Sequence, residues 1–89
     1  MPKVSVIIPC YNQGQYLDEA VDSVLNQTFE DFEIIIVNDG STDDFTNNLL
    51  VNYHKPKTKV ISTQNQGLPS ARNNGIKIAS GEYICCLYC

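Results

Sequence analysis

Two side chains suited to binding a planar ligand follow apolar runs in this 89-residue sequence. Tyr11 comes two residues after Pro9, and an aromatic ring at that place can stack on a nucleobase. Asp39 follows the apolar run 34–37, and its carboxylate can accept a hydrogen bond from a base or a sugar. A plainer interpretation stays open for both, because a tyrosine can half-pack on a helix and Asn-Asp-Gly is a common turn.

Two charged residues extend this set. Arg72 is the only arginine and lies in the first turn of an expected helix, where a positive charge needs a nearby anion. A diphosphate would supply that anion, and so would a carboxylate such as Asp39. Asp43 is suited to cap the helix that follows it, and capping does not exclude contact with a ligand.

Composition and missing motifs exclude several functions. The chain contains no G-x-x-x-x-G-K-[ST] sequence, and no G-x-G-x-x-G follows its first apolar run. A mononucleotide kinase and a typical dinucleotide enzyme are therefore disfavoured. The net charge of −4 also disfavours non-specific binding to nucleic acid.

The elements that must position these residues alternate along the chain. Runs rich in β-branched residues predict strands at 3–8, 32–37, 59–63 and 82–88. Apolar residues at helical spacing predict helices at 16–25, 45–53 and 68–79. The first strand is expected to end at Pro9, Asp18 and Glu19 to lie near the start of the first helix, and Gly81 to stop the last helix.

This order predicts a single domain of the α/β class. Right-handed crossovers between parallel strands give an open, mostly parallel sheet with helices on both faces. Ligands bind such sheets outside the carboxyl ends of the strands. The polar segments 9–12, 38–43 and 65–67 follow predicted strands, so the candidate site is expected at that edge.

Four sequence blocks occur in order. They are V-S-V-I-I-P-C-Y-N at 4–12, I-V-N-D-G-S-T-D at 36–43, N-x-G-x-x-x-A-R-N-x-G at 65–75 and A-x-G-E-Y-I at 79–84. Together they resemble the N-terminal half of the family 2 inverting glycosyltransferases, which have the GT-A, Rossmann-like fold. The resemblance covers essentially the whole chain and implies that residues 1–89 are the N-terminal nucleotide-sugar-binding part of a glycosyltransferase domain.

The resemblance also implies partners and roles. The donor would be a nucleotide-diphosphate sugar, commonly a UDP-sugar, and the sugar would pass to an acceptor hydroxyl with inversion. Tyr11 would stack on the uracil, Asp39 would accept a hydrogen bond from its ring N–H, and Arg72 would lie near the base or the diphosphate. Pro9 would shape the strand end, and Asp43 would hold the loop, as would Asn65.

One departure from the family concerns catalysis. In the family the fourth strand leads into an acidic cluster that carries a divalent metal, Mn or Mg, whereas here Tyr88 and Cys89 follow that strand. We therefore expect a domain truncated after its fourth strand, inactive alone, without a complete metal site or a general base. The parent would be an enzyme acting on a sugar, polysaccharide or lipid-linked glycan. The apolar fourth strand would form a sheet edge, through which two copies are expected to pair.

Other classes of function remain open. A nucleotide-binding or interaction module without turnover would use the same strand ends. Cys86-x-x-Cys89 has the spacing of a redox pair or half a zinc site, with Cys10, Cys85 and His54 as further ligands, although His54 also suits a helix end. The sequence shows no signal peptide and no run of ~20 apolar residues, so a cytoplasmic location is expected, with the parent able to associate with the inner face of a membrane.

Overall fold

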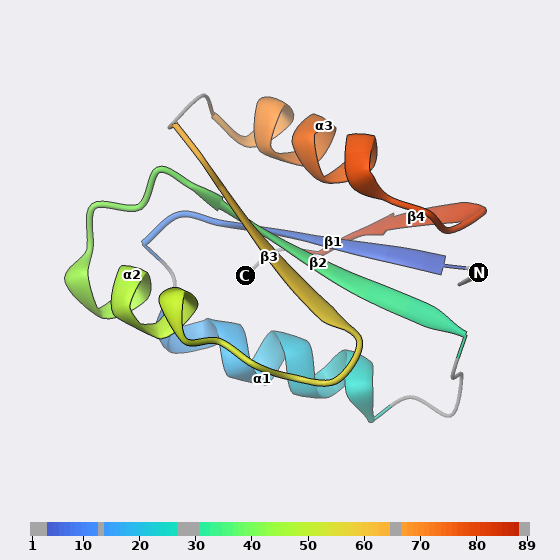
Figure 1. Cartoon of the computed structure of the whole chain (residues 1–89), viewed down its shortest axis with the longest axis horizontal. Coiled ribbons are helices and arrows are strands. Elements are labelled where there is room, and N and C mark those ends of the chain that lie inside the picture. The colour runs from blue at the N-terminus through green and yellow to red at the C-terminus, as the bar shows by residue number, and fades with distance from the viewer. Residues whose placement is uncertain (1–3, 13, 27–30, 65–66, 88–89) are drawn as a thin grey trace.

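Four parallel strands and three helices make up the computed structural model, which describes residues 4–12, 14–26, 31–64 and 67–87. The strands are β1 (Val4–Cys10), β2 (Phe32–Asp39), β3 (Thr58–Thr63) and β4 (Tyr83–Cys86), and the helices are α1 (Gly14–Leu25), α2 (Asp44–Val51) and α3 (Leu68–Ile78). The sheet order is β3-β2-β1-β4, with α1 and α2 on one face and α3 on the other (Figure 1). The predicted open α/β sheet is confirmed.

Strand β2 is the centre of the core. All eight of its residues are buried, as expected for a parallel strand covered on both faces. On one face Ile34 and Ile36 join a cluster with Leu17 of α1. On the other face Ile35 and Val37 pack in a second cluster that includes Ala71 of α3.

Helix α3 lies close to the sheet because its inner face carries small residues. Ala71 is fully buried, and a Cβ atom built on Gly75 would lie 2.5 Å from Cγ2 of Ile7 and 3.2 Å from Cγ2 of Val37. A larger residue at position 75 would push the helix away from β1 and β2. The small side chains therefore set the distance between α3 and the strands.

Two carboxylates of β2 hold the two ends of the α3 segment. The backbone N–H of Gly67, just before α3, donates to Oδ2 of Asp39 at 3.2 Å. The backbone N–H of Ser80, just after α3, donates to Oε2 of Glu33 at 2.7 Å. Six residues of strand span about 20 Å, which is close to the length of α3 with its flanking turns.

Strand β1 continues through Pro9, so the prediction that it ends there was wrong. Pro9 pairs with Val37 in the register of β1 and β2. The carbonyl of Ile7 accepts the N–H of Leu87, and alternate residues of a parallel strand face the same neighbour. The nitrogen of Pro9 thus faces the β4 side, where the pairing of the described residues ends at Ile7, so its missing N–H interrupts no hydrogen bond between β1 and β2.

The helix ends also differ from the expectations. Helix α1 begins at Gly14, which places Asp18 and Glu19 beyond its first turn. Arg72 is the fifth residue of α3 and so lies past its first turn. Helix α3 ends at Ile78, before Gly81, so Gly81 is not the residue that stops the helix.

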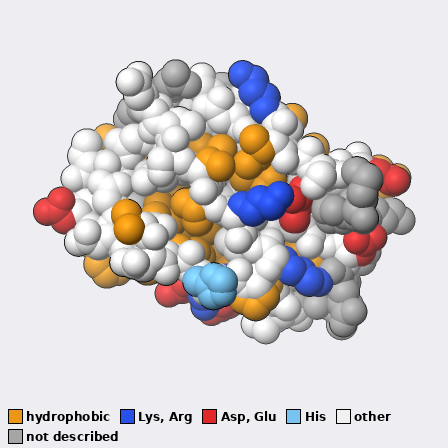
Figure 2. All heavy atoms as spheres, in the orientation of Figure 1, with side chains coloured by type: hydrophobic (Ala, Val, Ile, Leu, Met, Phe, Trp, Pro, Cys, Tyr) orange, Lys and Arg blue, Asp and Glu red, His pale blue; other side chains and the backbone are white. Residues whose placement is uncertain are grey.

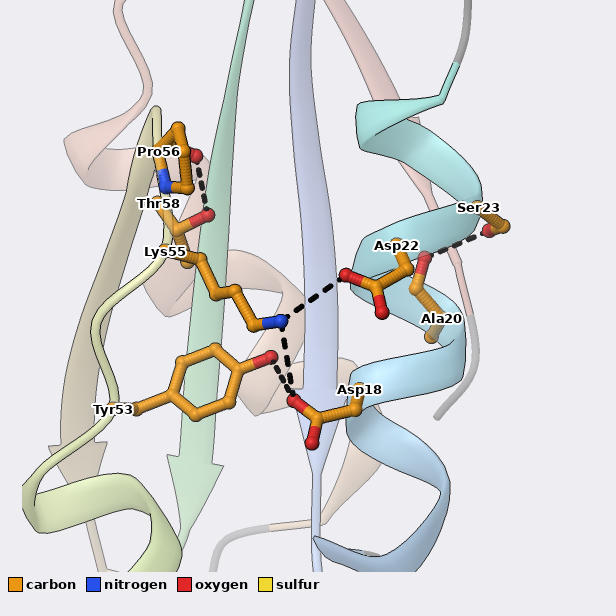
Figure 3. Close-up of polar contacts among 8 residues, drawn as sticks. All are labelled: Asp18, Ala20, Asp22, Ser23, Tyr53, Lys55, Pro56 and Thr58. Atoms are coloured by element: carbon orange, nitrogen blue, oxygen red, sulfur yellow. Dashed lines mark hydrogen bonds and ion pairs between the residues drawn. The ribbon is translucent and has the colours of Figure 1, made fainter.

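Asp18 acts at a contact between α1 and the segment that follows α2, rather than at a helix end. The hydroxyl of Tyr53 donates to Oδ1 of Asp18 at 2.8 Å, and the ammonium of Lys55 lies 3.2 Å from Oδ1 of Asp22 and 3.9 Å from Oδ1 of Asp18 (Figure 3). These contacts attach the segment that follows α2 to α1. They are exposed, so each is expected to add only a few tenths of a kcal/mol.

Strand β4 forms one edge of the sheet and is shorter than predicted. Its four residues are all exposed, including Tyr83 and Ile84. Tyr88 and Cys89, which were expected to extend or follow it, lie outside the described residues. Within the described ranges, no helix has the length and apolar character needed to cross a membrane.

The close approach of α3 predicts that Gly75→Ala destabilises the fold. The added methyl group overlaps Ile7 in a packed layer, a cost of about 1–3 kcal/mol that outweighs the ~1 kcal/mol gained in helix propensity. Urea denaturation measures the change. Asn73→Ala, at an exposed position of the same helix, is the control and leaves stability unchanged or raises it.

Candidate functional site

All the predicted site residues except Arg72 lie at or just after the carboxyl ends of β1 and β2, on the left of the sheet in Figure 1. Pro9 is buried near the end of β1, and Tyr11 follows that strand. Asp39 is the last residue of β2, and Asp43 lies four residues further on. Arg72 lies on α3, whose N-terminal end Asp39 holds through Gly67.

Asn12 joins the loops that follow β1 and β2. Its side-chain carbonyl accepts the backbone N–H groups of Thr42 and Asp43, both at 2.8 Å, and its side-chain nitrogen donates to the hydroxyl of Thr42 at 3.1 Å. Its own N–H donates to Oγ of Ser41 at 3.1 Å. Asn12 has φ 55°, a conformation that asparagine tolerates better than most residues.

A second set of amide hydrogen bonds shapes the loop after β2. Asn38 accepts the N–H of Ser41 at 3.1 Å and donates from its side chain to Asn47 of α2 at 3.1 Å. Asn47 in turn donates to the carbonyl of Ser41 at 2.7 Å. Side chains from a strand and a helix therefore both bond the backbone of this loop at Ser41.

Asp43 caps α2, which confirms the capping interpretation. Its Oδ2 accepts the backbone N–H of Thr46 at 3.1 Å and the Thr46 hydroxyl at 2.7 Å. The Thr46 hydroxyl also accepts the N–H of Gly14, the first residue of α1, at 3.0 Å. A Cβ on Gly14 would lie 2.9 Å from Cα of Thr46, so α1 and α2 start in close contact.

Asp39 and Tyr11 differ in exposure. Asp39 is only 4% exposed and lies on the α3 side of the sheet, paired in register with Thr63 of β3. The Thr63 hydroxyl is buried and has no hydrogen-bond partner among the described residues. Tyr11 is 41% exposed, which fits both the stacking interpretation and that of a half-packed side chain.

Sequence reasoning missed part of this arrangement. Asn12 and Asn38 were recognised only as polar residues at strand ends, and Thr46 and Thr63 were not singled out. The local signal for Asn12 was its residue type, which accepts a positive φ. Asn38 also bonds Asn47, 9 residues away, and Thr46 also bonds Gly14, 32 residues away, so only the fold brings these pairs together.

Cavities lie at both ends of the described part of the sheet. One of about 320 Å³ lies at the carboxyl ends of β2 and β3, beside α2, and is lined by Asn38, Ser41, Asn47, Ser62 and Thr63 among others. A larger one of about 810 Å³ lies at the opposite end and is lined by His54 and three lysines among others. Figure 2 shows basic side chains and the histidine on the face that carries β3, separated by apolar atoms.

The lysines of the larger cavity have partners. Lys55 pairs with Asp22, and Lys59 pairs with Glu33 at 3.3 Å. Lys57 lies 4.6 Å from the centre of the Phe32 ring. These contacts reduce the positive potential there, so the size of the cavity does not by itself favour an anionic ligand.

The described residues do not make a metal site. Within the part of the chain that the structure describes, no three His, Cys, Asp or Glu side chains lie close enough together to hold an ion. Cys85 and Cys86 are exposed on β4, whereas Cys10 is buried in β1. Cys89, the second cysteine of the Cys86-x-x-Cys89 spacing, is outside the described residues.

Comparison with known proteins matches nearly the whole chain to one family. The family model "Glycosyl transferase family 2" matches residues 5–87. The chain is 48% identical over 86 residues to the uncharacterized glycosyltransferase EpsJ of Bacillus subtilis, covering 94% of this chain and 25% of that protein. It is 42% identical over 85 residues to chondroitin synthase of Escherichia coli, covering 94% of this chain and 12% of that protein.

Solved structures agree with this family. S. aureus TarS 1-349 superposes with a TM-score of 0.81 at 34% identity, covering 97% of this chain and 27% of that one. The mannosyltransferase PcManGT of Pyrobaculum calidifontis, solved with GDP-Man and Mn2+, superposes with a TM-score of 0.80 at 27% identity, covering 93% and 26%. The fold is that of the GT-A glycosyltransferases, and the chain belongs to glycosyl transferase family 2. It spans a quarter or less of the length of these two curated relatives.

The loop network predicts that Asn12→Gly weakens the fold. Glycine keeps the positive φ without strain, so the loss of stability reports the hydrogen bonds of the Asn12 side chain, worth about 1–2 kcal/mol in this partly exposed setting. Chemical denaturation measures the difference. Asn12→Asp is the control, because it keeps the side-chain oxygen that accepts the N–H groups of Thr42 and Asp43 and also tolerates a positive φ, and it is expected to lose less stability than Asn12→Gly.

Proposed function

We propose that the carboxyl ends of β1 and β2 bind the nucleotide of a nucleotide-diphosphate sugar, with UDP-sugars as the preferred class. One observation carries this proposal. An exposed aromatic ring, Tyr11, and a buried carboxylate, Asp39, lie at the ends of two neighbouring strands. An aromatic ring binds the face of a base, and a carboxylate reads a ring N–H. Family membership supports the same assignment.

Each proposed site residue has a distinct role. Tyr11 stacks on the base, and Asp39 accepts its N–H while keeping the start of α3 in place through Gly67. Arg72, on α3, neutralises charge on the diphosphate. Pro9 fixes the backbone before Tyr11, and Asp43 holds the loop through its cap on α2.

The parent enzyme is proposed to transfer the sugar to an acceptor hydroxyl of a glycan by single displacement with inversion. That reaction needs a base to take the proton of the acceptor hydroxyl and positive charge on the leaving diphosphate. Of the residues described here, we assign only Arg72 to the leaving diphosphate, and we assign none as the base for the acceptor hydroxyl. We therefore propose that residues 1–89 bind the donor and do not complete a transfer alone.

A divalent metal, Mn or Mg, would supply further charge to the diphosphate in the parent. The titratable side chains described here do not fit such an ion, because no three of them converge. We derive no step through a metal from this chain. Binding of the nucleotide by these residues is accordingly proposed to be independent of added Mn2+.

Calorimetric titration with UDP, with and without Mn2+, tests the proposed site. We expect weak, metal-independent binding that Asp39→Ala abolishes and that Tyr11→Ala weakens about 5- to 150-fold, as loss of a stacking contact of about 1–3 kcal/mol implies. GDP, the nucleotide part of the sugar donor in the mannosyltransferase structure, is the comparison ligand and is expected to bind less tightly.

Asp44→Ala is the matched control for that titration. Asp44 is an exposed acid at the first position of α2, close in sequence to Asp43, and its removal is expected to leave UDP affinity unchanged. A folded wild-type chain that does not bind UDP would contradict the proposal. A full transferase that binds nucleotide without transferring sugar would instead favour a non-catalytic binding module.

We propose in addition that the 89-residue chain pairs with a second copy through β4. Among the described residues no strand pairs with the outer side of β4 along Tyr83–Cys86, which also carries exposed apolar side chains, and strands with this character join other strands. Light scattering coupled to size exclusion is expected to give a dimer mass at high concentration. Ile84→Lys is expected to shift the mass to that of a monomer, and a wild-type chain that remains monomeric would contradict this proposal.

A further inference from the structure

Glu33 is a buried carboxylate that the proposed nucleotide site does not use. It lies near the start of β2, at the opposite end of the strand from Asp39, and is 6% exposed. Its Oε2 accepts the Ser5 hydroxyl at 2.6 Å and both the N–H and the hydroxyl of Ser80 at 2.7 and 2.9 Å. Its Oε1 lies 3.3 Å from the ammonium of Lys59.

These contacts converge on the segment that leads into β4. The Ser5 hydroxyl, while donating to Glu33, accepts the N–H of Gly81 at 2.8 Å. A Cβ on Gly81 would lie 2.7 Å from the backbone nitrogen of Ser5, so the backbone of this segment rests directly on β1. Ser80 and Gly81 are thereby fixed just before β4 begins at Tyr83.

Strand β4 has little else to hold its register. It pairs with β1 over only four residues, from Val4↔Tyr83 to Ile7↔Cys86, and all four of its residues are exposed. A slip by one residue would exchange the two faces of the strand and move everything after it by about 3.3 Å. Apolar burial alone therefore specifies the position of β4 weakly.

The register of β4 matters for the far end of the sheet. Leu87 donates its N–H to the carbonyl of Ile7, so the chain leaves β4 parallel to β1, whose carboxyl end leads to Tyr11. We propose that Glu33 is a positioning residue that, through Ser5, Ser80 and Gly81, sets the register of β4 and so the position of Leu87 beside β1, the strand that leads to the nucleotide site. This role at the site rests on the proposed function.

The charge of Glu33 provides a readout specific to this role. Burial raises the pKa of Glu33, but the hydrogen bonds from Ser5, Ser80 and Lys59 outweigh burial and lower it from 4.5 to about 2. Lys59 of β3 is the charged partner of Glu33, while β1 and the segment before β4 present hydroxyl and amide groups to it. The other titratable residues that line the cavity beside Glu33 are Asp31, His54, Lys55 and Lys57. The Glu33 contacts are therefore fully present above about pH 4.5 and are lost as the pH falls toward 2.

Amide hydrogen exchange of the 89-residue chain followed by NMR tests the proposal. In Glu33→Gln we expect the amides of β4 and Leu87 to exchange at least tenfold faster, while those of β2 and β3 change less than threefold. Ser5→Ala, which removes the link to Gly81 and keeps the carboxylate, is expected to give the same local pattern. Glu82→Gln, at an exposed acid next to β4, is the matched control and leaves all rates unchanged.

The pH profile separates positioning from general loss of stability. Protection of the β4 amides in the wild type is expected to fall relative to β2 between about pH 4.5 and pH 2, and Glu33→Gln to abolish this dependence. Equal acceleration in all four strands, or no acceleration in β4, would overturn the proposal. Titration with UDP keeps the two proposals distinct, because a wild-type chain that binds no UDP contradicts the nucleotide site whatever the exchange pattern of the Glu33 variants.

Discussion

The complete burial of β2 is the constraint on which the rest of the structure depends. A strand covered on both faces must place each of its polar side chains against a partner, since an unpaired buried carboxylate costs several kcal/mol. Glu33 and Asp39 meet this condition by accepting backbone N–H groups at opposite ends of the α3 segment. The strand that forms the core thereby also fixes the helix that carries Arg72.

Hydrogen bonds from side chains to the backbone also shape the two loops at the proposed site. Asn12 accepts the backbone N–H groups of Thr42 and Asp43, which joins the end of β1 to the loop after β2. Asn38 accepts the N–H of Ser41 in the same loop. Asp43 and Thr46 then attach that loop to the starts of α1 and α2. Tyr11 is left exposed beside these hydrogen-bonded loops, where the proposed function needs an accessible ring.

Local pattern predicted the elements well and their ends less well. The apolar run of β2 predicted a strand that is buried on both faces, and the position of Asp43 predicted a helix cap. Both predictions were possible because the signals are local in the sequence. Pro9 led to a wrong end for β1. Whether its missing N–H ends the strand depends on how far β4 pairs with β1, which the local sequence does not show. Glu33 could not be recognised, since its partner Ser80 lies 47 residues away and a lone acid in an apolar run usually marks a solvated face.

Mapping of amide chemical shifts during titration with UDP tests the central claim most directly. The account predicts that shifts concentrate in residues 9–12, 38–43 and the first turns of α3, with little change at the larger cavity near Lys55, Lys57 and Lys59. Shifts centred on that cavity would contradict the account. They would show that charge at the amino ends of the strands, rather than the ring of Tyr11 and the carboxylate of Asp39, selects the ligand.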